Sequence, residues 1–209
     1  MAINLGGNFG NMQNNNPVPA NSGLTLNLKK NDVLDLTKRN PGLKKVILGA
    51  GWDIAVGGSD FDLDIAAFLL DANNKFNDIS NVIFFNNKAG QGITLGDDNR
   101  TGAGDGDDER MSLDLSAINP SIQKIIFLVT IHGAREKRQT FGMINNSYVR
   151  LLDEAQNEKE LCRFDLKENG STATTVIFSE LYRQGAEWQF KALGEGKIGD
   201  LNEVLATYQ

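Results

Sequence analysis

The chain has 209 residues, of which 40% are hydrophobic, and a formal net charge of −6 at pH 7. Its length allows one large β domain or two small ones, and no linker divides it. A pI near 4.9 disfavours nucleic acid as a partner, because phosphate binding requires a basic surface. The longest apolar runs, 65–70 and 125–129, are far shorter than the roughly 20 residues of a bilayer helix, so no integral membrane segment is expected.

The start of the chain and its cysteine content favour a cytoplasmic protein. The first ten residues, MAINLGGNFG, have neither the basic region nor the apolar segment of a secretory signal. The single Cys162 cannot form an internal disulfide, which suits a reducing compartment. Because Cys162 alternates with Phe164 in a strand-like segment, we expect it in the core and not as a reactive thiol.

In chain order, residues 1–23 are rich in Asn and Gly and are expected to form a flexible tail, followed by one domain over 24–209. Apolar alternation and short apolar runs predict strands at 24–28, 33–36, 44–48, 61–70, 82–85, 111–115, 122–131, 148–152, 161–166, 174–181 and 188–193. This spacing predicts an all-β fold, a β-sandwich of two mostly antiparallel sheets. Only the end of the chain is helical in pattern, because Asp200 and Glu203 match a capping box and Leu201, Val204, Leu205 and Tyr208 share one face.

Two stretches concentrate the negative charge of the chain. Between Gly96 and Glu109, six acidic residues face a single arginine, which gives a local charge of −5. A second charge of −5 comes from five aspartates between 53 and 71, a segment without Lys or Arg. Because the remaining residues carry a net positive charge, the acidity is local, and it predicts cation binding more than general solubility.

The strand expected at 61–70 begins with carboxylates on one face. Residues two apart share a face of a strand, so Asp60, Asp62 and Asp64 lie together at its start. The rest of the strand is apolar on both faces, as in a sandwich core. Charges at the edge of such a core are costly to desolvate, so a metal or well-placed donors should accompany them.

Oxygen ligands without nearby His or Cys suit calcium or magnesium, and a flexible loop with many carboxylates favours calcium. Both acidic stretches match only part of the EF-hand loop: position 6 of the first is Ile65, and strands flank the second. The glycine-rich segment 102–106 has no lysine to act as a phosphate loop. GAGWDI at 49–54 lacks the third glycine of a dinucleotide fingerprint.

No nucleophile with a neighbouring base is evident, so the chain is expected not to be an enzyme. His132, the only histidine, closes a strong strand and is expected to be a structural or surface residue. Trp52 and Trp188 are expected to fill the sandwich. One alternative remains open at this point: a metal-dependent enzyme that uses the acidic site.

The chain resembles the TerD family of tellurite-resistance and bacterial stress proteins over most of residues 24–209. The resemblance rests on six segments in the expected order: LGAGWD (48–53), FDLDIAAFLLD (61–71), GDDNRTGAGDGDDE (96–109), IIFLVTI (125–131), TFGMINNSYVRLLD (140–153) and VIFSELYRQGAEWQFKALGEG (176–196). Two features depart from the family pattern, namely the first 23 residues and the additional carboxylate of Asp97.

This resemblance implies a cytoplasmic β-sandwich that binds two calcium ions and acts with other stress and tellurite-resistance proteins. It implies a non-enzymatic role, in which calcium orders a surface for partner proteins. Since some members of the family are described as cyclic-nucleotide-binding, the resemblance also leaves open a small-ligand sensor that uses the acidic site. The residues carried over as metal ligands are Asp62, Asp64, Asp98, Asn99, Gly104, Asp107, Asp108 and Glu109, with Asp60 as a weaker candidate.

Overall fold

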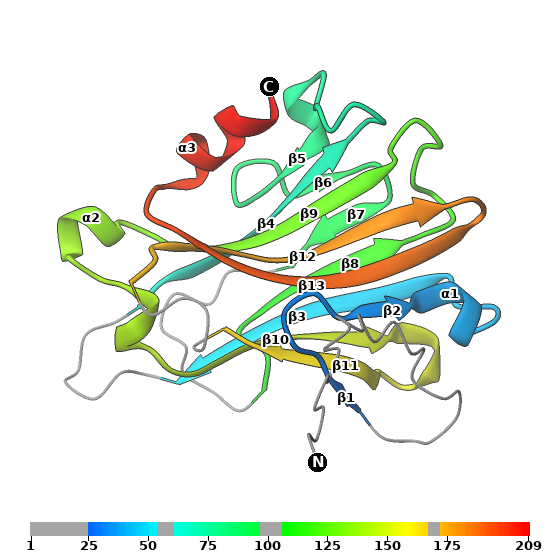
Figure 1. Ribbon diagram of the computed structural model, residues 1–209, viewed down its shortest axis with the longest axis horizontal. Helices are drawn as coiled ribbons and strands as arrows, with labels where there is room; N and C mark the ends of the chain where they lie inside the picture. The colour runs from blue at the N-terminus through cyan, green and yellow to red at the C-terminus, as the bar shows by residue number, and fades with distance from the viewer. Residues whose placement is uncertain (1–24, 54–60, 97–105, 167–171) are drawn as a thin grey trace, which may run out of the picture.

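The computed structural model describes residues 25–53, 61–96, 106–166 and 172–209, and within them thirteen strands form two sheets (Figure 1). Sheet A has the order β1 (Leu26–Asn27), β11 (Lys159–Asp165), β10 (Asn145–Asp153), β3 (Lys45–Asp53), β8 (Glu109–Asp114), β7 (Ile93–Leu95) and β6 (Ala89–Gly90). Sheet B has the order β2 (Val33–Asp35), β13 (Glu187–Lys197), β12 (Thr175–Gln184), β9 (Lys124–Ile131), β4 (Leu63–Leu70) and β5 (Val82–Ile83). The predicted all-β sandwich is confirmed.

The pairing is antiparallel throughout the described strands except between β1 and β11, which run parallel. Among the described residues, the short helices α1 (Leu36–Arg39) and α2 (Ala134–Lys137) lie between strands, and α3 (Leu201–Leu205) follows β13. The 3₁₀ turns are η1 (Ile79–Asn81), η2 (Phe141–Met143), η3 (Glu154–Gln156) and η4 (Ala206–Tyr208).

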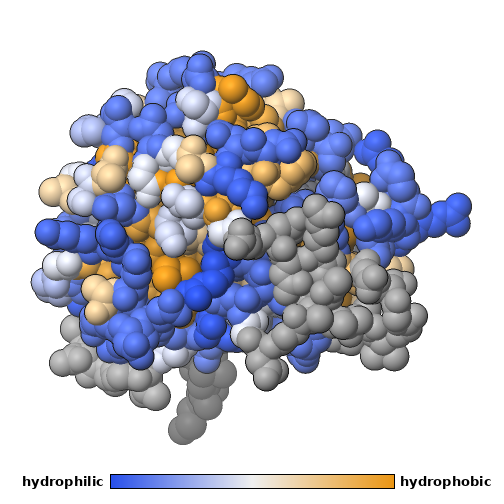
Figure 2. Space-filling model, turned by 180° about the vertical axis from the view of Figure 1, so that it is seen from behind, coloured by the Kyte–Doolittle hydropathy of each residue, from blue (hydrophilic) through white to orange (hydrophobic). Residues whose placement is uncertain are grey.

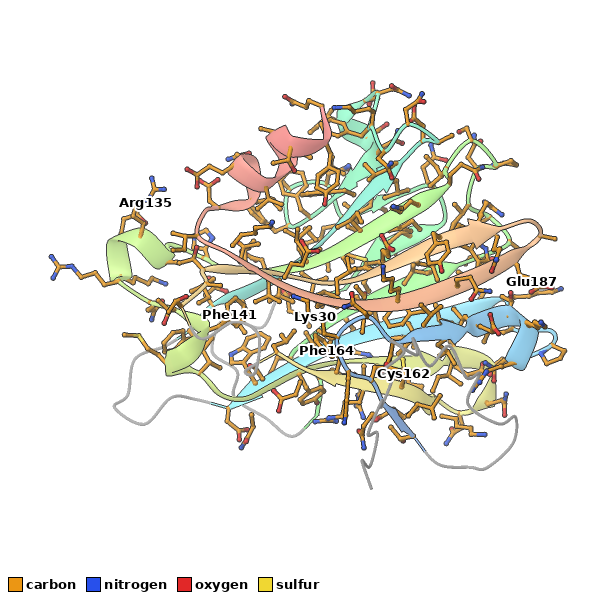
Figure 3. The ribbon with its side chains drawn as sticks, viewed as in Figure 1. Lys30, Arg135, Phe141, Cys162, Phe164 and Glu187 are labelled. Carbon is orange, nitrogen blue, oxygen red and sulfur yellow. The ribbon has the colours of Figure 1, made fainter. Side chains whose placement is uncertain are left out.

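The main core lies between the sheets and contains the inward residues of both. Trp52 from β3 and Trp188 from β13 are buried in it, as the sequence predicted. Cys162 and Phe164, labelled in Figure 3, also belong to this core. Burial raises the pKa of the Cys162 thiol to about 12. The expectation of a buried and unreactive cysteine therefore agrees with its surroundings.

A second, smaller apolar cluster covers the outer face of sheet B. Phe68 of β4 and Leu128 of β9 are fully buried there beneath Val204 and Leu205 of α3 and the following turn. Figure 1 shows α3 lying along this sheet. The helix begins at the predicted capping box, in which the Asp200 side chain accepts from the Glu203 N–H and the Glu203 side chain accepts from the Asp200 N–H. Because the main core covers the inner face of sheet B and this cluster covers its outer face, β4 is apolar on both faces.

Several element boundaries differ from the prediction. The strand expected at 44–48 continues as β3 to Asp53, through Gly49 and Gly51. The strand expected at 111–115 begins at Glu109, inside the acidic stretch. The short strands β6 and β7 were not predicted. The N-terminal segment 1–23 lies outside the described residues.

The outer strand at each edge of both sheets is short. β1 and β6 at the edges of sheet A have two residues each, and β2 and β5 at the edges of sheet B have three and two.

The face of the molecule in Figure 2 is mostly hydrophilic, with smaller apolar areas between the hydrophilic ones.

Candidate metal centre

The acidic stretch 96–109 connects β7 to β8, which pair as neighbours in sheet A. At its base, the Gly96 N–H donates to the Arg110 carbonyl oxygen at 2.8 Å, so the two ends of the connection meet. From this base the chain leaves through residues outside the described set and returns at Gly106. The three residues before Arg110 then point to different surroundings.

Glu109 faces the space between the sheets. It shares the inward face of β8 with Met111 and Leu113 and is only 3% exposed. Its Oε2 accepts a hydrogen bond of 2.6 Å from the Ile65 N–H of β4, in the opposite sheet. In the described residues β5 pairs with β4 only at Ala67 and Phe68, which leaves the Ile65 N–H on an edge that the sheet does not cover. The Glu109 carboxylate therefore links sheet A to sheet B at the start of β8.

Asp108 lies beside the end of β3. Its N–H donates to the Ala50 carbonyl oxygen at 2.8 Å, and its Oδ2 accepts from the Trp52 N–H at 2.9 Å. The residue is 9% exposed. These two bonds extend the pairing between β3 and β8, whose last Cα partners are Ala50 and Glu109. The Asp108 carboxylate is thus held at the end of β3.

Asp62 and Asp64 lie at the beginning of β4, next to the last residues of β9. The His132 N–H donates to the Asp62 carbonyl oxygen at 2.8 Å, and His132 Nδ1 lies 3.4 Å from Asp64 Oδ2. Because Leu63 and Ile65 belong to the main core, the Asp64 side chain points to the outer face of sheet B. His132 is half-exposed and also contacts Phe85, which agrees with a structural or surface role.

Asp107 lies on the outer face of sheet A, on the opposite side from Glu109. Its side chain is 2% exposed and forms an ion pair of 2.7 Å between Oδ1 and Arg150 Nε. The hydroxyl of Tyr148 lies 3.3 Å from the same oxygen and donates to the Gly106 carbonyl oxygen at 2.9 Å. A Cβ on Gly49 would lie 2.2 Å from Asp107 Oδ2, so only glycine leaves room for this carboxylate.

The surroundings of Asp107 are electrostatically coupled. Burial alone would lower the pKa of Arg150, but hydrogen bonds to Asp107 and Glu160 outweigh burial and raise this pKa above its ordinary value. Burial and the negative charge of Asp107 raise the pKa of Tyr148. Arg150 thus remains charged, and the Asp107 charge is balanced by a cation of the protein itself.

The structure places the predicted ligands on different faces. Glu109 and Asp108 lie at the junction where β8 begins beside β4 and β3. Asp64 points to the outer face of sheet B, Asp62 precedes it beside His132, and Asp107 lies on the outer face of sheet A. Asp60, Asp98, Asn99 and Gly104 lie outside the described residues. Within the described part of the chain, no three His, Cys, Asp or Glu side chains come together closely enough to hold a metal ion. The donor set at the junction consists of oxygen atoms, which fits a hard cation.

Sequence reasoning did not identify Gly49, Tyr148 and Arg150 as part of this region. Arg150 is 43 residues from Asp107 in sequence, and a single arginine in a strand gives no signal of its partner. The two glycines in LGAGWD were a signal, because glycine inside a strand often marks a close approach by another group.

Comparisons with known proteins agree with the resemblance found in the sequence. The family model described as the TerD domain matches residues 24–208. The chain is 44% identical over 188 residues to the tellurium resistance protein TerD of Serratia marcescens, covering 88% of this chain and 97% of that protein. It is 46% identical over 189 residues to general stress protein 16U of Bacillus subtilis, with the same coverage.

Solved structures show the same fold. The crystal structure of a homologue of the telluride resistance protein from Streptomyces coelicolor superimposes with a TM-score of 0.66 at 26% identity. It covers 78% of this chain and 96% of that chain. Within the described residues, no helix has the length and apolar character needed to cross a membrane.

Proposed function

The chain belongs to the TerD family, and we propose that it is a non-enzymatic, cytoplasmic calcium-binding protein of tellurite resistance and the general stress response. The names of two relatives, a tellurium resistance protein and a general stress protein, support this physiological role. The observation that carries the calcium proposal is the Glu109 carboxylate, which is buried between the sheets and reaches the N–H next to Asp64.

The proposed calcium site joins the acidic connection to the start of β4. Glu109, Asp108, Asp62 and Asp64 would supply oxygen ligands from the described residues, and Asp60, Asp98, Asn99 and Gly104 would complete the set. Calcium accepts six to eight oxygen ligands, so we propose two adjacent ions that take their ligands from both stretches. Bound calcium would neutralise part of the local charge and stabilise the folded protein by mass action.

Such a site would order the surface around the acidic connection, and we propose that this surface binds other proteins of the same stress response. The only cysteine is buried with a raised pKa, so it offers no exposed thiolate to reduce or bind tellurite. The proposed role is therefore indirect, through partner proteins, and not chemical detoxification.

Calorimetry with chelator-stripped protein tests calcium binding. We expect a calcium-dependent heat and a higher melting temperature on calcium addition. The variant Glu109→Gln keeps an acceptor for the Ile65 N–H but removes the charge, so calcium affinity should fall by a factor of ten or more, about 1.4 kcal/mol. Glu158→Gln, at a half-exposed glutamate that pairs with Arg110, is the matched control. Absence of calcium heat in the unmodified protein would contradict the proposal.

Complementation tests the physiological role. A strain lacking its own copy should regain tellurite tolerance with the unmodified gene and with Glu158→Gln, but less with Glu109→Gln. Equal rescue by Glu109→Gln, in a protein whose calcium affinity is shown to be reduced, would separate tolerance from calcium binding.

A further inference from the structure

A pocket of about 440 Å³ lies at the edge of sheet A, away from the place where Glu109 of β8 contacts β4. It forms where the segment after β1, the start of β10 and the end of β11 meet, and Figure 1 shows β1 beside β11 at this edge. Its volume lies in the usual range of small-molecule sites, about 300 to 1,000 Å³. Its lining includes Asn27, Leu28, Lys29, Asn146, Tyr148 and Arg163.

The pocket has the opposite charge from the chain as a whole. Lys29 and Arg163 line it together with one acid, Asp165, which gives a local charge of +1 in a protein of net charge −6. Glu160, on the same strand as Arg163, lies 4.0 Å from Arg163 but 3.1 Å from Arg150. Glu160 therefore balances Arg150 more closely than Arg163. The two cations in the lining favour an anion.

Arg163 is held in an orientation suited to an oxyanion. Its guanidinium carbon lies 3.4 Å from the centre of the Tyr148 ring, so the planar group stacks on the ring. Tyr148 is fixed in turn by its hydrogen bond to the Gly106 carbonyl oxygen. A guanidinium stacked on one face keeps its N–H groups directed outward in its own plane, where they can form two parallel bonds to a carboxylate or phosphate.

Other groups around the pocket suit an organic ligand. The carboxamide of Asn27 supplies a further donor, and Leu28 with the Tyr148 ring supplies apolar contact. The Asn146 carboxamide donates one N–H to Asp53 Oδ2 and has a second N–H for a ligand. Asn146 has a left-handed backbone with φ of 50°, at the irregularity between Asn145 and Tyr148 in the pairing of β10 with β3. We propose that this pocket binds a small organic oxyanion, with Arg163 as the bidentate anchor and Lys29 as the second positive charge.

Nuclear magnetic resonance titration of the full chain, ¹⁵N-labelled and in calcium-free buffer, tests the proposal. The probes are inorganic phosphate, phenyl phosphate and benzoate, each compared with sodium chloride at equal ionic strength. We expect saturable shifts of the Lys29, Asn146 and Arg163 amides that chloride does not produce. Phenyl phosphate binding more tightly than benzoate would identify the ligand group as a phosphate, and the reverse order as a carboxylate.

Variants assign the binding to the pocket. Arg163→Met should raise the dissociation constant at least tenfold, and Arg163→Lys should raise it too, because lysine keeps the charge but loses the planar fork. Arg135→Met removes an exposed arginine on α2 and should change it less than twofold. Lys29→Met tests the site if the Arg163 variants do not fold. Shifts that match those of chloride, or equal binding by the folded Arg163 or Lys29 variants, would overturn the proposal.

Discussion

The ion pair between Asp107 and Arg150 should contribute measurably to stability, and a double-mutant cycle can isolate it. The variants are Arg150→Met, Asp107→Ala and the combination of both. In Arg150→Met the Asp107 carboxylate stays in place, with a side chain only 2% exposed. It then keeps the Tyr148 hydroxyl at 3.3 Å and the more distant Arg110 at 3.8 Å. In Asp107→Ala, Arg150 keeps its bond to Glu160.

These contacts set the expected magnitudes. Removing one partner of a fully buried ion pair costs about 3–5 kcal/mol. The Arg150 side chain is 25% exposed, and the remaining contacts of Asp107 reduce the cost, so we expect about 2–3 kcal/mol for Arg150→Met. Asp107→Ala should cost about 1–2 kcal/mol, because Arg150 retains a partner. The double variant should be more stable than the sum predicts, by about 1–2 kcal/mol.

Urea denaturation in the presence of a chelator measures the four free energies of unfolding without any contribution from metal. The control cycle uses Arg110 and Glu158, which are 2.8 Å apart but about 40% and 48% exposed. For this surface pair we expect a coupling of about 0.2–1 kcal/mol. A coupling for Asp107 and Arg150 that is no larger than the control value would refute the view that burial makes this pair important.

Three further predictions follow from packing, burial and capping. Gly49→Ala should destabilise the protein strongly, since its Cβ would overlap the Asp107 carboxylate. In an Asp107→Ala background the same substitution should cost much less, and thermal unfolding with and without Gly49→Ala in each background measures the difference. Cys162 should stay protonated at pH 8, well below its pKa of about 12, and react with a thiol reagent only after denaturant is added; fast labelling of the native protein would contradict its burial. Asp200→Ala should cost about 1 kcal/mol by removing the cap of α3, while Asp200→Asn should cost less, both measured by urea denaturation.

The sequence predicted the elements whose signals are local. The period-two pattern of β4, the continuous apolar run of β9 and the capping box at Asp200 each depend on residues within one segment. Each of these elements is present in the structure. The two-layer arrangement was predictable as well, because many short strands with few helical patterns have few other ways to bury their apolar faces.

The candidate site could be predicted only in part, because the acidic residues 107 to 109 face different surroundings that alternation does not predict. Asp107 and Glu109 are two residues apart in the sequence. Asp107 pairs with Arg150 on the outer face of sheet A, whereas Glu109 accepts a hydrogen bond from the Ile65 N–H between the sheets. Asp107 precedes the regular strand, so its direction does not follow from alternation with Glu109. The partners come from β10 and β4, and no pattern in one segment indicates which distant strand will lie beside it.

The glycines of β3 illustrate the same limit. The prediction ended this strand at residue 48, before the segment GAGWD. The structure continues β3 because Gly49 and Gly51 leave the outer face open for the Asp107 carboxylate and the Tyr148 ring. The reason for these glycines is thus tertiary contact, which local propensity does not contain.

The short strands at the borders of both sheets bear on how the protein behaves when it is abundant. A long, flat border strand is a template on which another chain can add its own strand, which is how fibrils and domain-swapped aggregates grow. Here each border ends in two or three paired residues within the described part of the chain. A fold with this edge design can accumulate to high concentration in a stressed cell with little tendency to polymerise through its sheets.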